Sequence, residues 1–381
     1  MTVVCPGCGN RDELNPVRWR CSCGGLFDLE DHDAGLTLAS NDRHGMWRYA
    51  GMLHPATHDL DWQALTLGEG MTPLVSLETH PTGARVLGKL EYVMPTLSFK
   101  DRGAVMLVAA ARRLGVRRMV ADSSGNAGTA IAAYAARAGI PLEVYVPTAT
   151  SAKKTVQMRV HGAVVHWVDG NRAAAADAAI GAVERSGAFY ASHVYNPLFV
   201  EGVKTFAFEL VEQLHGKAPD LLVLPVGNGT LVLGTYRGFR QLQRSGLVDD
   251  IPPILAVQAR RCAPIAAAFA ADAAHVAAVA PETTMAEGIA IAAPPRGAEI
   301  LAVVRASNGR VVTAPEEAIL PAQARLAARG LFVEPTAAAT YAGLSDWLNG
   351  PGATWITAHS HRTGRPPLIV LPLCGAGLKA T

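Results

Sequence analysis

Charged residues are scarce in this sequence, and neither sign dominates. Of the 381 residues, 17% are charged and 50% are hydrophobic, and the formal net charge is +2. A chain with this much apolar material can bury a large core, so the composition argues against intrinsic disorder. The balanced charge, with no long run of one sign, argues against nucleic acid as a partner.

Long apolar runs and a secretory leader are also missing. No stretch approaches the roughly 18 uninterrupted apolar residues that indicate a membrane-spanning helix. The first residues, MTVVCPGCGN, contain no basic region followed by an apolar one, so no secretory signal is predicted. We therefore expect no membrane partner and a cytoplasmic location.

Cysteine is rare after residue 23, where only Cys262 and Cys374 occur. The other four lie in two glycine-rich turns, CPGCGN and CSCGG: Cys5, Cys8, Cys21 and Cys23. In a reducing compartment such a cluster is more typical of a metal site than of disulfides, and four thiolates suit tetrahedral zinc. The second pair has C-x-C rather than C-x-x-C spacing, so ordinary turns or a site that has lost its metal remain alternatives.

From about residue 85 onward, short apolar runs alternate with longer, alanine-rich helical patterns. The predicted strands are RRMVAD, PLEVYVP, AVVHWV, AFYAS, DLLVLPV, PPILAVQA and LIVLPL. This alternation indicates parallel sheets covered by helices on both faces. The sequence therefore predicts an α/β protein with two such lobes. The segment AHSHRTGRPP is predicted to be a solvated loop, and its two histidines, like His193, are predicted to be ordinary.

Three glycine-bearing loops follow predicted strands, at the edge where open parallel sheets bind ligands. In VGNGT, Gly227 and Gly229 let backbone N–H groups converge at a helix N-terminus, which is typical of a phosphate site. The loop lacks the Lys-Ser/Thr of a nucleotide-hydrolysing P-loop. Glycines that only shape the turn are the alternative.

The loop SSGNAG offers the hydroxyls of Ser123 and Ser124 and the amide of Asn126 beside another helix start. This combination suits a carboxylate. Helix capping is the alternative, but one cap needs one such residue, and here three occur in four positions. The third loop, CGAG, places Cys374 at a strand end, where a small buried hydrophobic residue is the simpler interpretation.

Lys100 lies at the start of an apolar helix in MPTLSFKDRGAVMLVAAARRLG. The positive end of the helix dipole disfavours its charged form there, so its amine is more readily deprotonated. Lysine is the residue that forms imines with carbonyl compounds. A phosphate loop, a carboxylate loop and this lysine together indicate a phosphorylated aldehyde cofactor. Asp101 and Arg102 are interpreted as structural.

The segments PTLSFKDRGA, SSGNAG, VGNGT, EGVKT, ETTMAEGIAI, FVEPTAA and CGAGLK together resemble the threonine synthase family, which consists of pyridoxal-phosphate enzymes of fold type II. The upstream LGEGMTPL and the cysteine turns also resemble segments of that family. The resemblance covers nearly the whole chain. It implies a pyridoxal 5′-phosphate cofactor, an amino-acid substrate, a homodimer, and a lyase that converts O-phosphohomoserine to threonine and phosphate.

The resemblance also implies a division into four segments. Residues 1–35 would form the zinc-ribbon-like module, and residues 36–85 a lead-in segment packed on the larger lobe. Residues 86–200 would form the first, smaller lobe with the lysine, and residues 201–381 the second, larger lobe with the phosphate loop.

Roles carry over residue by residue. Lys100 would form the imine with the cofactor, Asn126 would hydrogen-bond its phenolic oxygen, and Cys374 would face its pyridine nitrogen. The residues matching the phosphate site are Gly227, Asn228, Gly229 and Thr230. The residues matching the site for the substrate carboxylate are Ser123, Ser124 and Gly125.

Three residues depart from the family pattern. Leu97 stands where the motif has glycine, Phe199 where it has an arginine suited to a phosphate, and Cys374 where it has serine or threonine. Phe199 keeps open a threonine or serine dehydratase, or a β-replacement synthase, acting on a substrate without phosphate. Leu97 and Cys374 keep open a cofactor-binding regulatory protein with little turnover.

Overall fold

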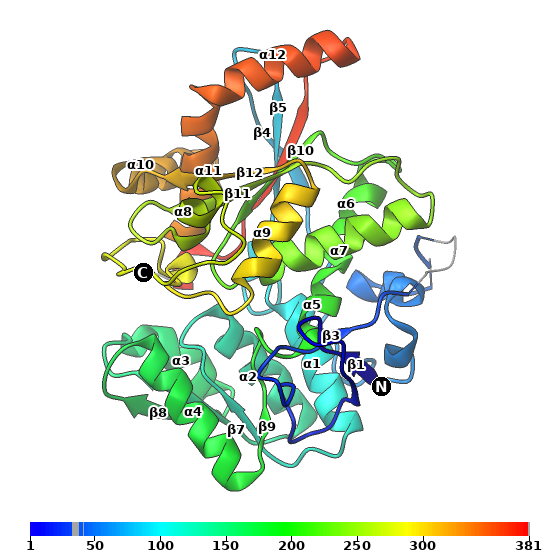
Figure 1. Ribbon diagram of the computed structural model, residues 1–381, viewed down its shortest axis with the longest axis vertical. Helices are drawn as coiled ribbons and strands as arrows, with labels where there is room; N and C mark the ends of the chain where they lie inside the picture. Colours follow the sequence, from blue (N-terminus) through cyan, green and yellow to red (C-terminus); the bar gives the residue numbers. More distant parts are fainter. Residues whose placement is uncertain (33–37, 41, 380–381) are drawn as a thin grey trace. The chain divides into compact units, whose positions relative to one another are not determined.

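The computed structural model describes residues 1–32, 38–40 and 42–379 (Figure 1). The chain divides into two compact units. Unit 1 comprises Met1–Met71 and Met94–Thr205, and unit 2 comprises Thr72–Val93 and Phe206–Thr381. The predicted lead-in segment 36–85 is therefore split at residue 71, because its last part forms strands that pair within the sheet of unit 2. No helix among the described residues is long and apolar enough to cross a membrane.

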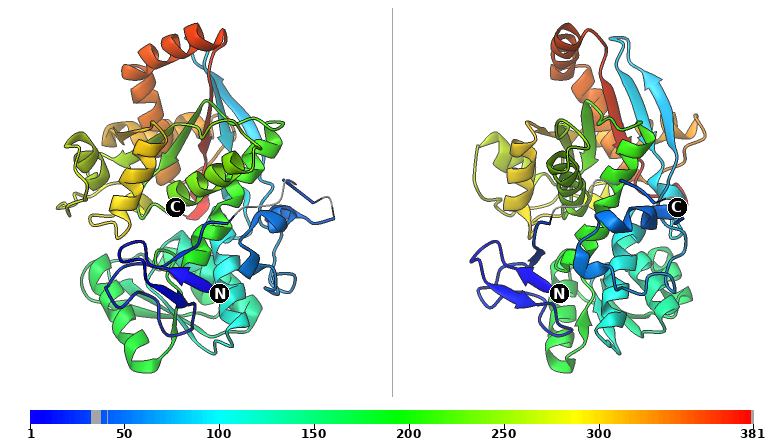
Figure 2. Two further views of the ribbon diagram at one scale, coloured as in Figure 1. Left: turned by 45° about the vertical axis from the view of Figure 1, so that its right-hand side comes forward. Right: turned by 90° about the vertical axis from the view of Figure 1, so that its right-hand side faces the viewer.

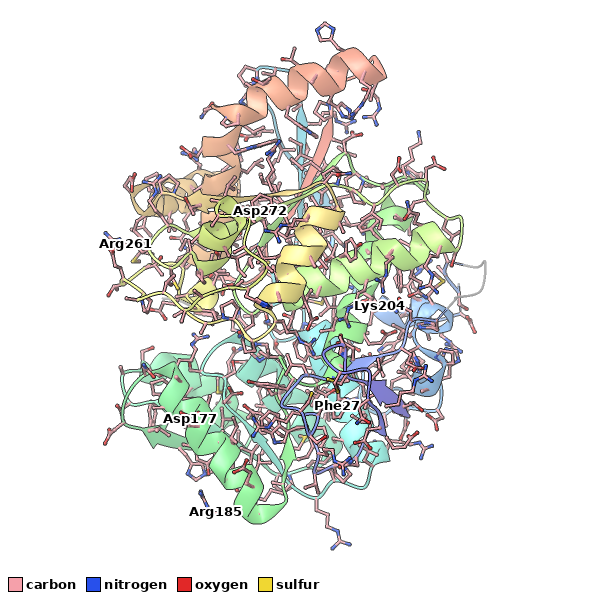
Figure 3. All side chains as sticks on the ribbon, in the orientation of Figure 1. Phe27, Asp177, Arg185, Lys204, Arg261 and Asp272 are labelled. Atoms are coloured by element: carbon pink, nitrogen blue, oxygen red, sulfur yellow. The ribbon has the colours of Figure 1, made fainter. Side chains whose placement is uncertain are left out.

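The N-terminal segment of unit 1 is a small antiparallel sheet. Its strands are β1 (Thr2–Val4), β2 (Arg11–Glu13) and β3 (Asp28–Leu29), in the order β2-β1-β3. Val3 and Phe27, which is labelled in Figure 3, form a small buried cluster with two of the four N-terminal cysteines. A cluster this small gives little stability by itself, and such modules usually depend on a metal or disulfides.

The larger sheet of unit 1 is parallel throughout. Its order is β8-β7-β6-β9, formed by β6 (Met119–Ala121), β7 (Leu142–Pro147), β8 (Val164–Val168) and β9 (Phe189–Tyr190). The helices of this unit are α1 (Asp101–Arg113), α2 (Asn126–Ala138), α3 (Ala152–Val160), α4 (Arg172–Ser186) and α5 (Pro197–Val203). This alternation confirms the first of the two predicted lobes.

Helix α4 shows why these segments fold as they do. Its N-cap Asn171 accepts hydrogen bonds from the backbone N–H groups of the first turn, and it ends at Gly187 with a φ of +65°, which glycine adopts without strain. Ala179 and Val183 face the sheet, whereas Asp177 and Arg185 are exposed and labelled in Figure 3. One apolar face and one polar face are what a helix covering a sheet requires.

The lead-in residues of unit 1 are organised by one buried carboxylate. Glu69 accepts hydrogen bonds from the Trp47 indole N–H (2.6 Å), the Thr66 hydroxyl (2.9 Å) and the Tyr134 hydroxyl of α2 (2.7 Å). Because a buried carboxylate without partners is costly, these bonds tie the segment before residue 71 to α2.

Unit 2 contains a six-stranded sheet in the order β12-β11-β10-β13-β5-β4. The strands are β4 (Leu74–Thr79), β5 (Arg85–Lys89), β10 (Leu221–Pro225), β11 (Ile254–Ala259), β12 (Arg310–Ala314) and β13 (Leu368–Pro372). All neighbours are parallel except β4 and β5. The helices are α6 (Thr205–Gln213), α7 (Thr230–Arg244), α8 (Pro264–Ala270), α9 (Gly297–Ala306), α10 (Glu316–Ala327), α11 (Pro335–Leu348) and α12 (Pro351–Thr363).

Helix α12 corrects the prediction for AHSHRTGRPP. Its first six residues belong to this helix, which begins at Pro351 and ends at the left-handed Gly364. His359 is buried, and its Nε2 lies 3.5 Å from a carboxylate oxygen of Asp220. The polar composition suggested a loop, but Ile356 of the same helix packs into the core of unit 2 and holds the segment helical.

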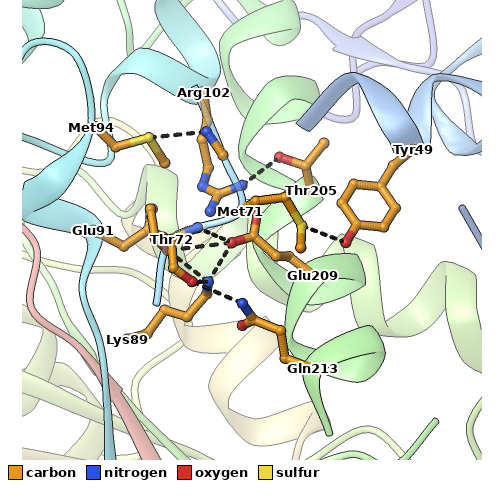
Figure 4. A network of polar contacts seen from close by, with 11 residues as sticks. Tyr49, Met71, Thr72, Lys89, Glu91, Met94, Arg102, Thr205, Glu209 and Gln213 are labelled. Carbon is orange, nitrogen blue, oxygen red and sulfur yellow. Dashed lines mark hydrogen bonds and ion pairs between the residues drawn. The ribbon is translucent and has the colours of Figure 1, made fainter. Parts of the chain in front are cut away.

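A largely buried polar network lies beside β5 in unit 2 (Figure 4). The Lys89 ammonium donates to the Thr72 carbonyl and hydroxyl oxygens, both at 2.6 Å, and pairs with the Glu209 carboxylate. The Thr72 hydroxyl donates to Glu91 (2.7 Å), and the Gln213 amide donates to the Thr72 carbonyl (2.9 Å). The network thus joins the first residue of unit 2 to β5 and α6.

Candidate active site

Lys100 is the N-cap residue of α1, as the sequence predicted for its position. The turn before it is closed by Asp101, whose carboxylate accepts hydrogen bonds from the Thr96 backbone N–H (2.7 Å) and the Thr96 hydroxyl. Leu97 lies inside this turn with a φ of +65°. That left-handed conformation costs a non-glycine residue about 1–2 kcal/mol, so the backbone at this position favours the glycine of the family motif.

Aromatic rings surround the Lys100 amine within unit 1. Its Nζ lies 4.4 Å from the ring centroid of Phe99 and 5.7 Å from that of Phe199. Phe199 of α5 is fully buried, and its ring packs directly on Gly103, where an added Cβ would come within 2.4 Å of it. The wall contributed by Phe199 is therefore apolar and fixed in place.

His193 lies beside these rings, although the sequence marked it as ordinary. Its ring meets that of Phe199 edge-on at 5.7 Å. Burial lowers the pKa of His193 well below its usual value, and the charges of Lys100 and Arg172 lower it further. The imidazole is therefore neutral. No motif surrounds this histidine, so the sequence carried no signal for its proximity to Lys100.

The SSGNAG loop connects β6 to α2 in unit 1. The N-cap of α2 is Gly125, which has no side chain to cap the helix, and the Ser123 hydroxyl accepts a hydrogen bond from the Gly125 backbone N–H at 3.4 Å. Because the first N–H groups of a helix have no partner within the helix, this end suits an anionic group such as a carboxylate.

The VGNGT loop connects β10 to α7 in unit 2. Gly229 is the N-cap of α7 with a φ of +81°, and an added Cβ would lie 2.4 Å from the side chain of Ile300. At Gly227 an added Cβ would lie 3.0 Å from the backbone of Ile289. Only glycine fits both positions, and the resulting backbone cradle at the start of a 15-residue helix suits a phosphate.

Cys374 follows β13, the strand that neighbours β10, so its loop and the VGNGT loop lie at the same edge of the sheet. Its thiol is buried and donates to the Pro372 carbonyl oxygen at 3.7 Å. The adjacent Gly375 leaves room for the Glu334 carboxyl group, which an added Cβ would approach to 2.4 Å. The sequence gave Glu334 no role, and its contact with this loop depends on tertiary packing.

Pyridoxal phosphate fits these residues chemically. A backbone cradle without a side chain at its two glycines can hold a phosphate, and a lysine at a helix start can bond to an aldehyde. Within unit 1, Lys100 directly precedes α1 and the SSGNAG loop leads into α2, and these two helices pack together. Within unit 2 it places the VGNGT loop and Cys374 side by side at the sheet edge.

The four N-terminal cysteines converge on one point. Their Sγ atoms lie within 4.8 Å of one another, with 3.6 Å between those of Cys5 and Cys23 and between those of Cys8 and Cys21. Tetrahedral zinc with Zn–S bonds of about 2.3 Å would separate its sulfur ligands by about 3.8 Å. The donors therefore fit zinc in both type and spacing.

We expect Gly229→Ala to lower the affinity for pyridoxal phosphate by at least about tenfold, because it combines left-handed strain with a clash against Ile300. Titration of the cofactor-free protein with pyridoxal phosphate measures this. Gly246→Ala is the matched control, since Gly246 has a φ of +68° but no atom within 4 Å of an added Cβ. Equal affinity losses in both variants would show that the clash plays no part.

Comparisons with known proteins show which family this chain belongs to. A family model described as "Pyridoxal-phosphate dependent enzyme" matches residues 65–354. The threonine synthase of Methanosarcina acetivorans is 34% identical, with 98% of this chain and 94% of that protein aligned, and that of Mycobacterium leprae is 36% identical over 84% of each. The structure of maize serine racemase shares the fold, with a TM-score of 0.68 and 22% identity over 80% of this chain and 88% of the other. The chain therefore belongs to the pyridoxal-phosphate-dependent enzymes and, within them, to the threonine synthase family.

Proposed function

We propose that this protein is a threonine synthase, a lyase that converts O-phosphohomoserine to threonine and phosphate. The observation that carries the proposal is the similarity to curated threonine synthases over 98% of the chain, with Lys100 placed at a helix N-cap between aromatic rings. Maize serine racemase, at 22% identity, shares the fold of this chain, and a similarity of that level carries no argument about the substrate.

Different residues of the chain have separate roles in the proposed reaction. Lys100 would hold the cofactor and would take the proton from the substrate Cα. Gly227, Asn228, Gly229 and Thr230 hold the cofactor phosphate. Ser123, Ser124 and Gly125 bind the substrate carboxylate, and Asn126 binds the phenolic oxygen of the cofactor. When bound, pyridoxal phosphate supplies an electron sink for the developing charge at Cα.

Cys374 sets the electronics of the proposed site. A buried thiol at the pyridine nitrogen would favour an unprotonated nitrogen, whereas an aspartate would favour a protonated one. A weakly protonated ring favours elimination and replacement over transamination. The thiol is also a weaker hydrogen-bonding group than the hydroxyl of the family pattern.

The test is to supply O-phosphohomoserine to the cofactor-loaded protein and to measure inorganic phosphate and threonine. Equimolar release of both supports the proposal. Parallel assays with threonine, serine and O-acetylserine address the second candidate, a dehydratase or β-replacement synthase, which the buried apolar wall of Phe199 favours. Keto acid or a replacement product, with no phosphate release, would overturn the proposal.

We further propose that the four N-terminal cysteines bind one structural zinc ion, supported by the convergence of their Sγ atoms. We expect about one zinc per chain and its loss in Cys21→Ser, measured by elemental analysis. Cys262→Ser, at a buried cysteine outside this cluster, should keep the metal. Zinc far below one per chain in the fresh protein would contradict the proposal.

We also propose a homodimer in the cytoplasm. The dimer is supported by resemblance to the family, and the location by the cysteine cluster, whose thiolates require reducing conditions to bind metal. Light scattering of the purified protein tests the dimer, and a monomeric mass at micromolar concentration would contradict it.

A further inference from the structure

The N-terminal cysteine module contacts the larger sheet of unit 1 through Trp19, two residues before Cys21. The Trp19 ring meets Tyr190 edge-on at 5.0 Å and Tyr195 edge-on at 4.8 Å. The Arg20 guanidinium stacks on Trp19 at 4.6 Å. Figure 2 shows the N-terminal strands beside this part of unit 1. Edge-on contacts between aromatic rings are stabilising beyond the burial of the rings, so Trp19 anchors the module.

Tyr190 connects this contact to the proposed substrate loop. It is the last residue of β9 and pairs with Val120 of β6, two residues before Asp122. The backbone N–H of Ala191, the residue after Tyr190, donates to the Val120 carbonyl oxygen at 2.8 Å. This bond and the strand pairing hold the end of β6, which leads into Asp122, against β9.

Asp122 is the residue immediately before Ser123, so its position sets the start of the Ser123–Gly125 loop. The other end of the loop is closely packed as well. Gly128, in the first turn of α2, approaches the Ser123 carbonyl oxygen so closely that an added Cβ would lie 2.0 Å from it. A small displacement of Asp122 therefore moves the hydroxyl and backbone N–H groups that the loop presents.

We propose that Trp19 and Tyr190 are positioning residues, through which the cysteine module holds the Ser123–Gly125 loop in its substrate-binding conformation. The inference rests on the proposed function in that the loop binds the substrate carboxylate. It gives the module a definite task in catalysis: metal bound near Cys21 fixes Trp19, Trp19 fixes the Tyr190 ring, and Tyr190, through the pairing of β9 with β6, fixes the chain before Asp122. Substrate affinity then depends on the metal, although none of these groups touches the substrate.

The first test is amide hydrogen exchange in the cofactor-loaded protein, which needs no turnover. In Trp19→Ala we expect residues 122–126 to exchange about tenfold faster, because two aromatic contacts are lost. Trp19→Phe keeps a ring and should restore most of the protection. Trp167→Ala is the matched control, since Trp167 is an exposed tryptophan on β8, the opposite edge strand of the same sheet. Unchanged exchange in Trp19→Ala would overturn the proposal.

The second test separates positioning from general damage. Trp19→Ala should raise KM for the amino-acid substrate about tenfold and leave kcat nearly unchanged, because the loop binds substrate without moving protons. A fall in kcat at unchanged KM would contradict the inference. If the wild-type protein turns over no substrate, the proposed function fails, while the exchange measurement still decides this inference.

The third test asks whether module and tryptophan act along one route. Removing zinc with a chelator should speed exchange at residues 122–126 in the wild type as much as Trp19→Ala does, and should add nothing in Trp19→Ala. Additive effects would show that the metal acts elsewhere and would overturn the link between module and loop. If the protein bound no zinc, the proposed effect of the metal on the loop would be refuted. Hydrogen exchange in the Trp19 variants would then decide whether Trp19 and Tyr190 position the loop.

Discussion

Replacing Lys100 with alanine should reduce kcat by about 10²–10⁴-fold, because the residue that moves the substrate Cα proton is lost. The visible absorption of lysine-bound pyridoxal phosphate should disappear in the same variant. The fold should survive, since Lys100 is an incompletely buried N-cap residue, where a positive charge is mildly unfavourable. Absorption spectra, thermal melts and steady-state kinetics on one preparation measure all three.

Lys217→Ala is the control for this experiment, because Lys217 is exposed and lies in the other unit. It should retain both the absorption band and the activity. Substantial turnover in Lys100→Ala would mean that another group moves the proton, and an intact absorption band would mean that another lysine binds the cofactor.

The largest loss of stability is expected for Lys89→Met in unit 2. The substitution leaves the Glu209 and Glu91 carboxylates buried without the Lys89 ammonium, and breaking a buried pair in this way costs about 3–5 kcal/mol. For a unit of this size the melting temperature should fall by roughly 6–20 °C. Calorimetry of the wild type and the variant measures the difference.

A second variant separates the effect of charge from that of packing. Lys89→Met combined with Glu209→Gln removes both partners of the ion pair, so it should be more stable than Lys89→Met alone. Lys217→Met controls for the loss of a surface lysine and should melt like the wild type. If the double variant were less stable than the single one, the loss would come from packing rather than from an unpaired charge.

The sequence was sufficient for the parts of the fold that local chemistry determines. Each predicted strand from RRMVAD to LIVLPL appears in the structure, because each is a short apolar run bounded by turn residues. Lys100, Gly125 and Gly229 occupy the helix starts where the motifs predicted them. Glycine turns and helix starts follow from neighbouring residues, so a single sequence reveals them.

The remaining features depend on residues far apart in the chain. Strands β4, β5 and β12 and the helical character of the segment around His359 were not predicted, because each is stabilised by partners in a distant sheet or core. The packing of Phe199 on Gly103 likewise joins segments that are far apart in the chain. No sequence pattern indicated the contact of Trp19 with the sheet, since Trp19 belongs to no motif.

The pairing of β5 with β13 has a consequence for synthesis on the ribosome. Arg85 of β5 pairs with Leu368 of β13, and Lys89 with Pro372. At about 5–20 residues per second, the ribosome needs on the order of 15–55 s to reach the second strand after making the first. During that interval β5 has β4 on one side and an open edge on the other. The nascent chain therefore carries an unprotected strand through most of its translation, which makes this segment a natural binding site for a chaperone.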